Sequence, residues 1–235
     1  GNVCKNLIKV FYLTERYKKL MPPECANLKP RSIKKCGVLG AGVMGGGIAQ
    51  ILSYHDIDAR LKDINYDALA KGLQAASKVF NQLVQKKRMK SSIAVAKMAK
   101  IGTTLDFTGF ANCDCVIEAV VEKMEVKKTV FAQISQKVPA DALLFSNTSA
   151  LSVTEMAKSV SNPSRFMGFH FFNPVHRMPL VELIYTKETS PQTMADALGL
   201  VRRLGKTPII VKDGPGFLVN RILLAYINEE GFILE

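Results

Sequence analysis

The stretch CGVLGAGVMGGGIAQ, residues 36–50, decides the fold of this chain. An apolar run over residues 36–39 leads directly into a glycine turn over residues 40–45, and helical spacing of apolar residues follows as far as residue 52. A second apolar run ends at Asp63, roughly 20 residues beyond the turn. Strand, glycine turn, helix, strand and acid, in that order, are typical of a dinucleotide-binding fold.

Each part of this motif has a physical task. The first glycine permits the tight turn, the second lets a pyrophosphate approach the backbone, and the third lets helix and strand pack closely. Free N–H groups and the positive end of the helix hold the phosphates. A carboxylate at Asp63 accepts hydrogen bonds from an adenosine ribose and repels a 2′-phosphate, which favours NAD over NADP. The cofactor residues expected from this motif are Gly40, Ala41, Gly42, Val43, Met44, Gly45 and Asp63. The alternative is an ordinary βαβ turn followed by a surface aspartate.

The composition indicates a globular protein with an unusually basic charge balance. The 235 residues are 48% hydrophobic and 22% charged, with a net charge of +12 and a pI near 9.5. Lys and Arg are scattered, aromatic residues make up only 8% and Trp is absent, which argues against a nucleic-acid-binding surface. A phosphate-rich small molecule, or solubility alone, accounts for the charge equally well.

Cysteine usage and hydropathy restrict the compartment and the metal chemistry. The five cysteines include no C-x-x-C pair, so we expect free thiols in a reducing compartment and no metal site. No apolar run is as long as a membrane helix, and no signal peptide opens the sequence.

Strands alternate with helices along most of the chain, which predicts an α/β fold with a Rossmann-like, doubly wound, mostly parallel sheet. The two helices after Asp63 are expected to project from this sheet as a hairpin. The expected elements are a helix over residues 6–19, a linker over 20–32, helices over 66–90 and 91–100, strands over 101–103, 115–120 and 143–146, and a helix over 123–136. Because ligands of such sheets lie beyond the carboxyl ends of the strands, residues 120–122 and 147–149 should face the cofactor.

A possible acid–base pair follows further along the chain. Residues 165–170 read as a strand that ends at His170, and a short loop leads to a second strand that contains Glu182. A short loop predicts an antiparallel return, so the two side chains should lie close together. Imidazole titrates near neutrality and can take a proton from a hydroxyl, while a carboxylate beside it fixes the tautomer. A lone histidine in an apolar stretch is more often a core residue, but the strand end and the nearby acid favour the catalytic interpretation.

Four motifs resemble the 3-hydroxyacyl-CoA dehydrogenase family. They are GAGVMG at residues 40–45, SNTS at 146–149, HFFNP at 170–174 and PGFLVNR at 215–221, and they occur in the family order. The segment HRMPLVE at residues 176–182 further resembles the α-subunits of bacterial fatty acid oxidation complexes, which join an enoyl-CoA hydratase to the dehydrogenase.

The resemblance implies NAD-dependent oxidation of (3S)-3-hydroxyacyl-CoA to 3-oxoacyl-CoA in β-oxidation. It implies His170 as the catalytic base with Glu182 as its partner, and Ser149 and Asn220 as substrate contacts. It also implies an NAD site lined by Met44, Asp63, Val120, Val121, Glu122, Lys127, Ser149 and Asn173. The dense basic cluster at residues 86–90 belongs to no family motif, and a solvated helix end is favoured over a contact with phosphates of the acyl carrier.

The resemblance also predicts the organisation of the chain. We expect a linker helix and linker over residues 1–32, an NAD-binding domain over 33–213, and the start of an all-helical C-terminal domain over 214–235. The chain is then a piece of a bacterial, cytoplasmic multifunctional protein that forms a homodimer or larger assembly and is a possible partner of a thiolase β-subunit.

Two other functions fit parts of the pattern. A non-catalytic NAD-binding or structural module could use the same fold, and a β-hydroxyacid dehydrogenase has a similar glycine turn. The second of these uses a catalytic lysine, whereas this chain has the HFFNP segment.

Overall fold

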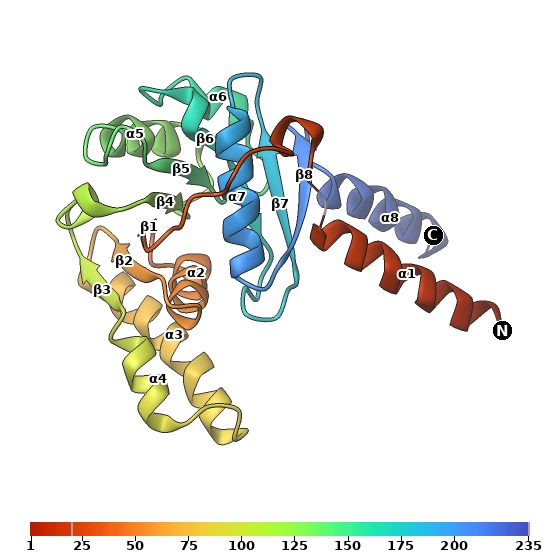
Figure 1. The fold of residues 1–235 in the computed structure, drawn as a ribbon, viewed down its shortest axis with the longest axis horizontal. Helices are drawn as coiled ribbons and strands as arrows, with labels where there is room; N and C mark the ends of the chain where they lie inside the picture. The colour runs from red at the N-terminus through yellow and green to blue at the C-terminus, as the bar shows by residue number, and fades with distance from the viewer. Residues whose placement is uncertain (20, 235) are drawn as a thin grey trace.

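The computed structural model describes residues 1–19 and 21–234, and in this part of the chain eight strands form one twisted sheet (Figure 1). The strand order is β3-β2-β1-β4-β5-β6-β7-β8. The strands are β1 Lys35–Leu39, β2 Asp58–Lys62, β3 Ile101–Thr104, β4 Cys115–Glu118, β5 Leu143–Ser146, β6 Phe166–Phe171, β7 Leu180–Tyr185 and β8 Thr207–Lys212. All neighbours pair in parallel except β6 and β7, which are antiparallel. The predicted doubly wound, mostly parallel sheet is confirmed.

Helices cover both faces of this sheet. The helices of the described residues are α1 Asn2–Lys19, α2 Val43–Tyr54, α3 Tyr66–Gln85, α4 Ser91–Met98, α5 Met124–Ile134, α6 Val153–Ala157, α7 Pro191–Arg203 and α8 Val219–Leu234. Residues of α2, α3 and α7 pack on one face, and residues of α5 and α6 pack on the other. Short 3-10 turns lie at Pro23–Cys25, Phe110–Asn112 and Pro163–Arg165. Leu20, the first residue of the predicted linker, lies outside the described residues. So does Glu235, the last residue of the predicted C-terminal segment.

The core has two halves because strand side chains alternate between the two faces of the sheet. On one face Val38 of β1 packs in a cluster with α2 and α7, which includes Leu52 and Leu198. On the other face Leu39 joins the cluster that includes Phe131 of α5. Both faces are therefore buried, as expected for a sheet whose strands read as continuous apolar runs.

The helix starts explain which backbone groups remain free for a ligand. The side chains of Asn65 and Ser190 cap α3 and α7 by accepting a hydrogen bond from the first turn. Helix α2 instead begins after Gly42, which has no side chain to cap it. The first-turn N–H groups of α2 therefore lack a side-chain partner at this position.

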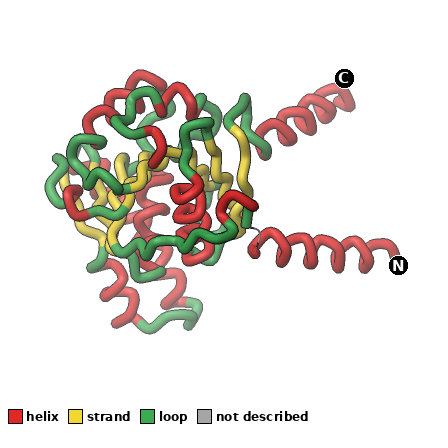
Figure 2. The backbone as a smooth tube through the Cα atoms, turned by 45° about the horizontal axis from the view of Figure 1, so that its top comes forward, coloured by secondary structure: helices red, strands yellow, loops and turns green. Residues whose placement is uncertain are grey.

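Three helical features project from the body of the domain. Helices α3 and α4 form the predicted hairpin, although α3 ends at Gln85, so the basic residues 86–90 lie in the connection and not in the helix. Helices α1 and α8 extend from the same side of the sheet (Figure 2). Helix α1 has no buried residue, and the apolar side chains of α8 at Ile222 and Leu224 are each 64% exposed.

The sequence prediction did not include α7 or β8, so the sheet is wider than expected. Strand β8 pairs in parallel with β7, and α7 connects the two across one face. The signal was present in the sequence, because Ser190 followed by Pro191 is a typical N-cap with proline at the first helical position.

The close packing of α2 on β1 depends on Gly45. A Cβ atom at Gly45 would lie 1.7 Å from the carbonyl oxygen of Gly40, so the backbone would have to move. We predict that Gly45→Ala lowers the free energy of unfolding by about 2 kcal/mol or more, the scale of overpacking in a core, as measured by urea denaturation. Gly42→Ala is the matched control, because a Cβ there meets no heavy atom within 4 Å. Equal loss in both variants would contradict the packing argument.

Candidate active site

A cavity of about 540 Å³ opens at the carboxyl ends of β1, β2 and β4. The cavity is lined by the turn after β1, by Asp63 and Ile64 after β2, and by Val120 and Val121 after β4. Of the predicted cofactor residues, the lining includes Gly40, Gly42, Val43, Met44, Asp63, Val120 and Val121. The glycine turn and the acid are therefore brought to one cavity, as the fingerprint requires.

The residues around this cavity fit a dinucleotide. A Cβ atom at Gly42 would project into open space beside the uncapped start of α2, so the glycine leaves room for a group against the backbone. That arrangement suits a pyrophosphate, which helix N-termini bind through free N–H groups and the helix dipole. Ile64 and Val121 are 83% and 61% exposed, and they give the cavity apolar walls that suit a flat base.

Asp63 is held in position by backbone groups. Its Oδ2 accepts a hydrogen bond from the Ala41 N–H at 2.6 Å, and its Oδ1 accepts one from the Ile64 N–H at 2.6 Å. The carboxylate thus lies against the glycine turn at the end of β2. Its role in selecting a ribose over a 2′-phosphate stays a prediction.

Beyond this cavity, a buried network of charged groups lies behind the site. Lys127 on α5 is 1% exposed, and its Nζ lies 2.6 Å from Glu118 Oε1 and 3.1 Å from Glu122 Oε2. Glu118 is fully buried at the end of β4, and it also accepts hydrogen bonds from the Val120 N–H and the Ser146 hydroxyl. Lys127 reaches Glu122 and does not line the cavity, so its predicted contact with NAD stays a prediction.

Glu122 connects this network to the turn that follows β5. Its Oε1 accepts hydrogen bonds from the Thr148 hydroxyl at 2.5 Å and from the Ser149 N–H at 2.7 Å. Burial alone would raise the pKa of Glu122, but the Thr148 hydrogen bond and the charge of Lys127 outweigh it, so the pKa lies below its usual value. The Asn220 side-chain amide donates to the Ser149 carbonyl at 2.8 Å. The two predicted substrate residues, Ser149 and Asn220, are therefore in contact.

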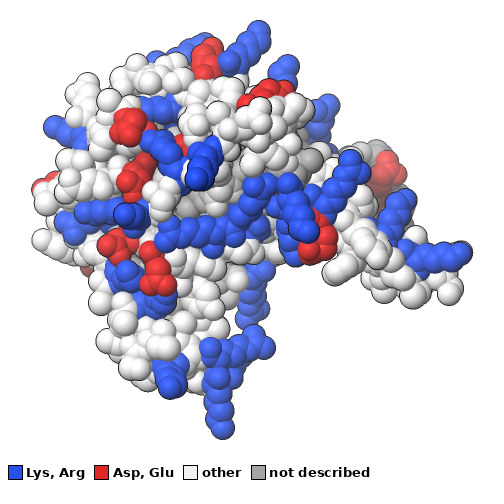
Figure 3. All heavy atoms as spheres, in the orientation of Figure 1, with Lys and Arg blue, Asp and Glu red and all other residues white. Residues whose placement is uncertain are grey.

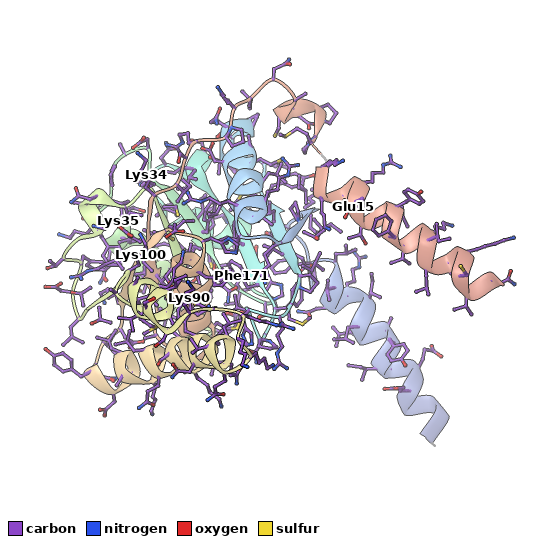
Figure 4. The ribbon with its side chains drawn as sticks, turned by 60° about the horizontal axis from the view of Figure 1, so that its bottom comes forward. Glu15, Lys34, Lys35, Lys90, Lys100 and Phe171 are labelled. Atoms are coloured by element: carbon purple, nitrogen blue, oxygen red, sulfur yellow. The ribbon has the colours of Figure 1, made fainter. Side chains whose placement is uncertain are left out.

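The predicted acid–base pair is formed. The antiparallel register places His170 directly opposite Glu182, and His170 Nδ1 lies 2.7 Å from Glu182 Oε2. His170 is 5% exposed and Glu182 is fully buried. Phe171, the residue after His170, is buried in the body of the domain, apart from helices α1 and α8 (Figure 4). The contact at Nδ1 leaves Nε2 as the nitrogen that can receive a proton.

The second oxygen of Glu182 is also used. Its Oε1 accepts hydrogen bonds from the Leu218 N–H at 3.0 Å and the Val219 N–H at 2.9 Å, at the start of α8. Burial would raise the pKa of Glu182, but the hydrogen bonds from His170 and from these two N–H groups lower it further than burial raises it. The pKa of Glu182 therefore lies below its usual value, and the carboxylate is charged at neutral pH.

The loop between β6 and β7 carries Asn173 and is fixed at both ends. The Asn147 side chain accepts a hydrogen bond from the Phe171 N–H at 2.8 Å. The buried ammonium of Lys206 donates to the carbonyls of Val175 and Met178. Asn173 itself is exposed at the surface of this loop, and its predicted contact with NAD stays a prediction.

Sequence reasoning missed two groups at the site. Glu118 is an acid inside an otherwise apolar strand, and that pattern alone could have marked it as a buried charge that needs a partner. The other groups are the N–H groups of Leu218 and Val219, which belong to the backbone and therefore cannot be predicted from the pattern of side chains. His170 and Glu182 are in contact as expected, whereas the hydrogen bond between Asn220 and Ser149 was not predicted.

Comparison with known proteins gives the family. Residues 35–214 match the family described as 3-hydroxyacyl-CoA dehydrogenase, NAD binding domain. The chain belongs to the 3-hydroxyacyl-CoA dehydrogenase family. NAD is accordingly the cofactor of this domain.

Relatives of this dehydrogenase domain support the assignment. The chain is 42% identical over 224 residues to the fatty acid oxidation complex subunit alpha of Idiomarina loihiensis. The aligned residues cover 95% of this chain but only 31% of that protein. The (S)-3-hydroxybutyryl-CoA dehydrogenase of Ralstonia eutropha matches with a TM-score of 0.82 and 39% identity, over 84% of this chain and 70% of that one. The 3-hydroxybutyryl-CoA dehydrogenase of Escherichia coli matches with a TM-score of 0.82 and 33% identity, over 85% and 42%.

The surface of the dehydrogenase domain carries its positive charge broadly. On the face shown in Figure 3, basic side chains are spread over the domain with acidic ones among them, and basic side chains extend from the end of the α3–α4 hairpin. None of the helices within residues 1–19 and 21–234 is long and apolar enough to cross a membrane.

The buried ion pair of Lys127 allows a sharp test of the network. We predict that Lys127→Met lowers the free energy of unfolding by about 3 kcal/mol or more, because it leaves Glu118 as an uncompensated buried charge. Lys128→Met is the matched control on the same helix, since Lys128 makes only a 3.8 Å contact with Glu155 at the surface and surface pairs contribute roughly 0–1 kcal/mol. Urea denaturation measures both. Similar losses in the two variants would show that the buried pair has no special role.

Glu182 predicts a pH dependence of stability. A carboxyl group whose pKa is lowered by folding stabilises the protein above its unfolded pKa, and this contribution is lost as the pH falls through the folded pKa. The ordinary pKa of a glutamate side chain is 4.5, so the stabilisation by Glu182 begins to be lost as the pH falls below 4.5. We predict that the free energy of unfolding then falls less steeply in Glu182→Gln than in the unmodified protein. A slope that does not change would contradict the lowered pKa, and urea titrations at a series of pH values measure it.

Proposed function

We propose that this chain carries the catalytic residues of an NAD-dependent dehydrogenase that oxidises (3S)-3-hydroxyacyl-CoA to 3-oxoacyl-CoA. The observation that supports this most directly is the 2.7 Å contact between His170 and Glu182, at the carboxyl edge of a sheet that also carries the NAD cavity. Hydroxyl oxidation needs a proton acceptor beside the hydride acceptor, and in this proposal His170 is the first and NAD held in the cavity would be the second.

In this proposal His170 is the base. NAD, when bound in the cavity, would supply the hydride acceptor for the C3 hydrogen. The hydroxyl proton moves to His170 Nε2, and the C3–O bond becomes a carbonyl. Glu182 holds the ring through Nδ1 and stabilises the imidazolium that forms, as the acid does in hydrolase triads. A charged Glu182 is required for this, and its lowered pKa is consistent with it.

The other predicted residues receive roles in the same scheme. We assign the pyrophosphate to the turn at Gly40, Ala41, Gly42, Val43, Met44 and Gly45, and the adenosine ribose to Asp63. The nicotinamide half is assigned to Val120, Val121, Glu122 and Ser149, with Asn173 on the following loop and Lys127 acting behind Glu122. Ser149 and Asn220 would contact the 3-oxygen and thioester region, and their mutual hydrogen bond supports a shared position.

We infer that the chain acts as one part of a larger protein. Residues 1–32 would be a linker, 33–213 the NAD-binding domain and 214–235 the start of a helical domain, and the exposed apolar side chains of α1 and α8 support such attachments. The relative in Idiomarina loihiensis is named as a complex subunit, so a thiolase β-subunit and a dimer or larger assembly are the proposed partners. Five free cysteines fit the bacterial cytoplasm. Sedimentation of the protein with and without the thiolase tests the partnership.

A non-catalytic NAD-binding module is the alternative function. It requires the cofactor cavity but gives no role to a buried histidine that is oriented by a buried carboxylate. Such a pair costs desolvation free energy and is typical of a catalytic base. The geometry therefore favours the dehydrogenase.

The test is a substitution of the base. We predict that His170→Gln lowers kcat about 100-fold or more, the usual scale for loss of a general base, while NAD binds as before. NADH absorbance with 3-hydroxybutyryl-CoA measures turnover, and calorimetry measures NAD binding. Phe172→Leu, a change at a ring that lies 4.5 Å from the imidazole ring, controls for disturbance of packing. Unchanged turnover in His170→Gln would remove the proposed mechanism, and turnover absent even from the unmodified full-length protein would favour the non-catalytic module.

A further inference from the structure

Glu182 has more partners than the orientation of His170 requires. Only Oε2 faces the imidazole, whereas Oε1 accepts the N–H groups of two consecutive residues, Leu218 and Val219. Leu218 lies directly before α8 and Val219 is its first residue, and backbone N–H groups at a helix start have no partner within the helix. The carboxylate therefore joins β7 to α8 at the same point at which it joins β7 to β6.

The segment before α8 needs such a restraint. Gly216 and Phe217 both have positive φ angles, of 69° and 48°, and for a bulky side chain such as Phe217 this conformation is strained. Phe217 is nonetheless 4% exposed, and its ring lies 6.0 Å from the ring of His170. A strained residue persists only where its surroundings hold it, and the hydrogen bonds to Leu218 and Val219 come directly after it.

Asn220 follows these residues by a single position. Its side-chain amide donates to the Ser149 carbonyl at 2.8 Å. The place of that amide depends on where α8 begins, and the start of α8 is fixed by Glu182 Oε1. The hydrogen bonds are charge-assisted, which makes them stronger and shorter than those between neutral groups.

We propose that Glu182 is also the positioning residue for Asn220, so that one carboxylate sets both the proton acceptor and the substrate-facing amide. This inference rests on the proposed function, because it assigns Asn220 to the acyl-CoA substrate. It goes further in giving the second oxygen of Glu182 a task of its own. The base and the amide then cannot be displaced independently of each other.

Val219→Pro tests the second oxygen without altering the dyad. Proline removes the Val219 N–H, which donates to Glu182 Oε1, and proline is well tolerated at the first position of a helix. Val219→Ala is the matched control, because it shortens the side chain and keeps the N–H. Amide hydrogen exchange at Leu218, measured by NMR on the 235-residue chain, should become faster in the proline variant and stay unchanged in the alanine variant.

Kinetic measurements test whether the effect of Val219→Pro on substrate binding depends on Asn220. In the full-length protein, Val219→Pro should raise KM for 3-hydroxybutyryl-CoA roughly 10-fold, the scale of one charge-assisted hydrogen bond, with NAD affinity unchanged. In an Asn220→Ala background the same substitution should add nothing. An equal rise in KM in both backgrounds, or unchanged exchange at Leu218, would overturn the proposal.

Glu182 variants separate its two tasks. Glu182→Gln keeps an oxygen that can accept from Leu218 and Val219 but turns an amide N–H₂ towards His170. It should therefore lose turnover and keep slow exchange at Leu218, whereas Glu182→Ala should lose both. Loss of slow exchange in the glutamine variant would contradict the separation. The exchange measurements need no turnover, so a failure of the proposed dehydrogenase activity would be recognised separately from a failure of this inference.

Discussion

Three charged side chains, Glu118, Lys127 and Glu182, are almost completely buried at the carboxyl edge of the sheet. A charge removed from water must be matched by an opposite charge or by hydrogen bonds, or the fold becomes unstable. Here the partners come from different elements, namely β4, β6, α5 and the start of α8. Satisfying the buried charges therefore fixes the relative positions of the segments that form the site. Stability and the geometry of the site depend on the same contacts.

Much of this arrangement could be predicted from the sequence, because the decisive signals are local. The glycine turn ending at Gly45 and the acid at Asp63 have fixed spacing, and the strand, helix, strand pattern around them is short range. His170 and Glu182 could be paired because a short loop leaves the second strand little choice but to return beside the first. The roles of Ser149 and Asn220 came only from the family resemblance, and their contact with each other was not predicted because the two lie far apart in the chain.

The parts that could not be predicted depend on contacts that leave no periodic signal. Lys127 on an amphipathic helix gives no indication that its ammonium turns inward to meet Glu118. Whether Oε1 of Glu182 is free or occupied depends on backbone N–H groups, which every residue except proline carries. Helix α7 and strand β8, which widen the sheet, were not predicted. The start of α7 was predictable, because Ser190 and Pro191 are typical of a helix N-terminus.

The antiparallel pairing of β6 with β7 has a consequence for how this part of the protein can vary. Side chains alternate between the two faces of a strand, so a shift of one residue in either strand would turn His170 or Glu182 away from the other. Insertions or deletions within the strands would therefore abolish the dyad. The loop that joins them is held at Val175 and Met178 by the Lys206 ammonium, so its length is constrained as well. Over evolutionary time, length variation should therefore spare both the two strands and the segment that connects them.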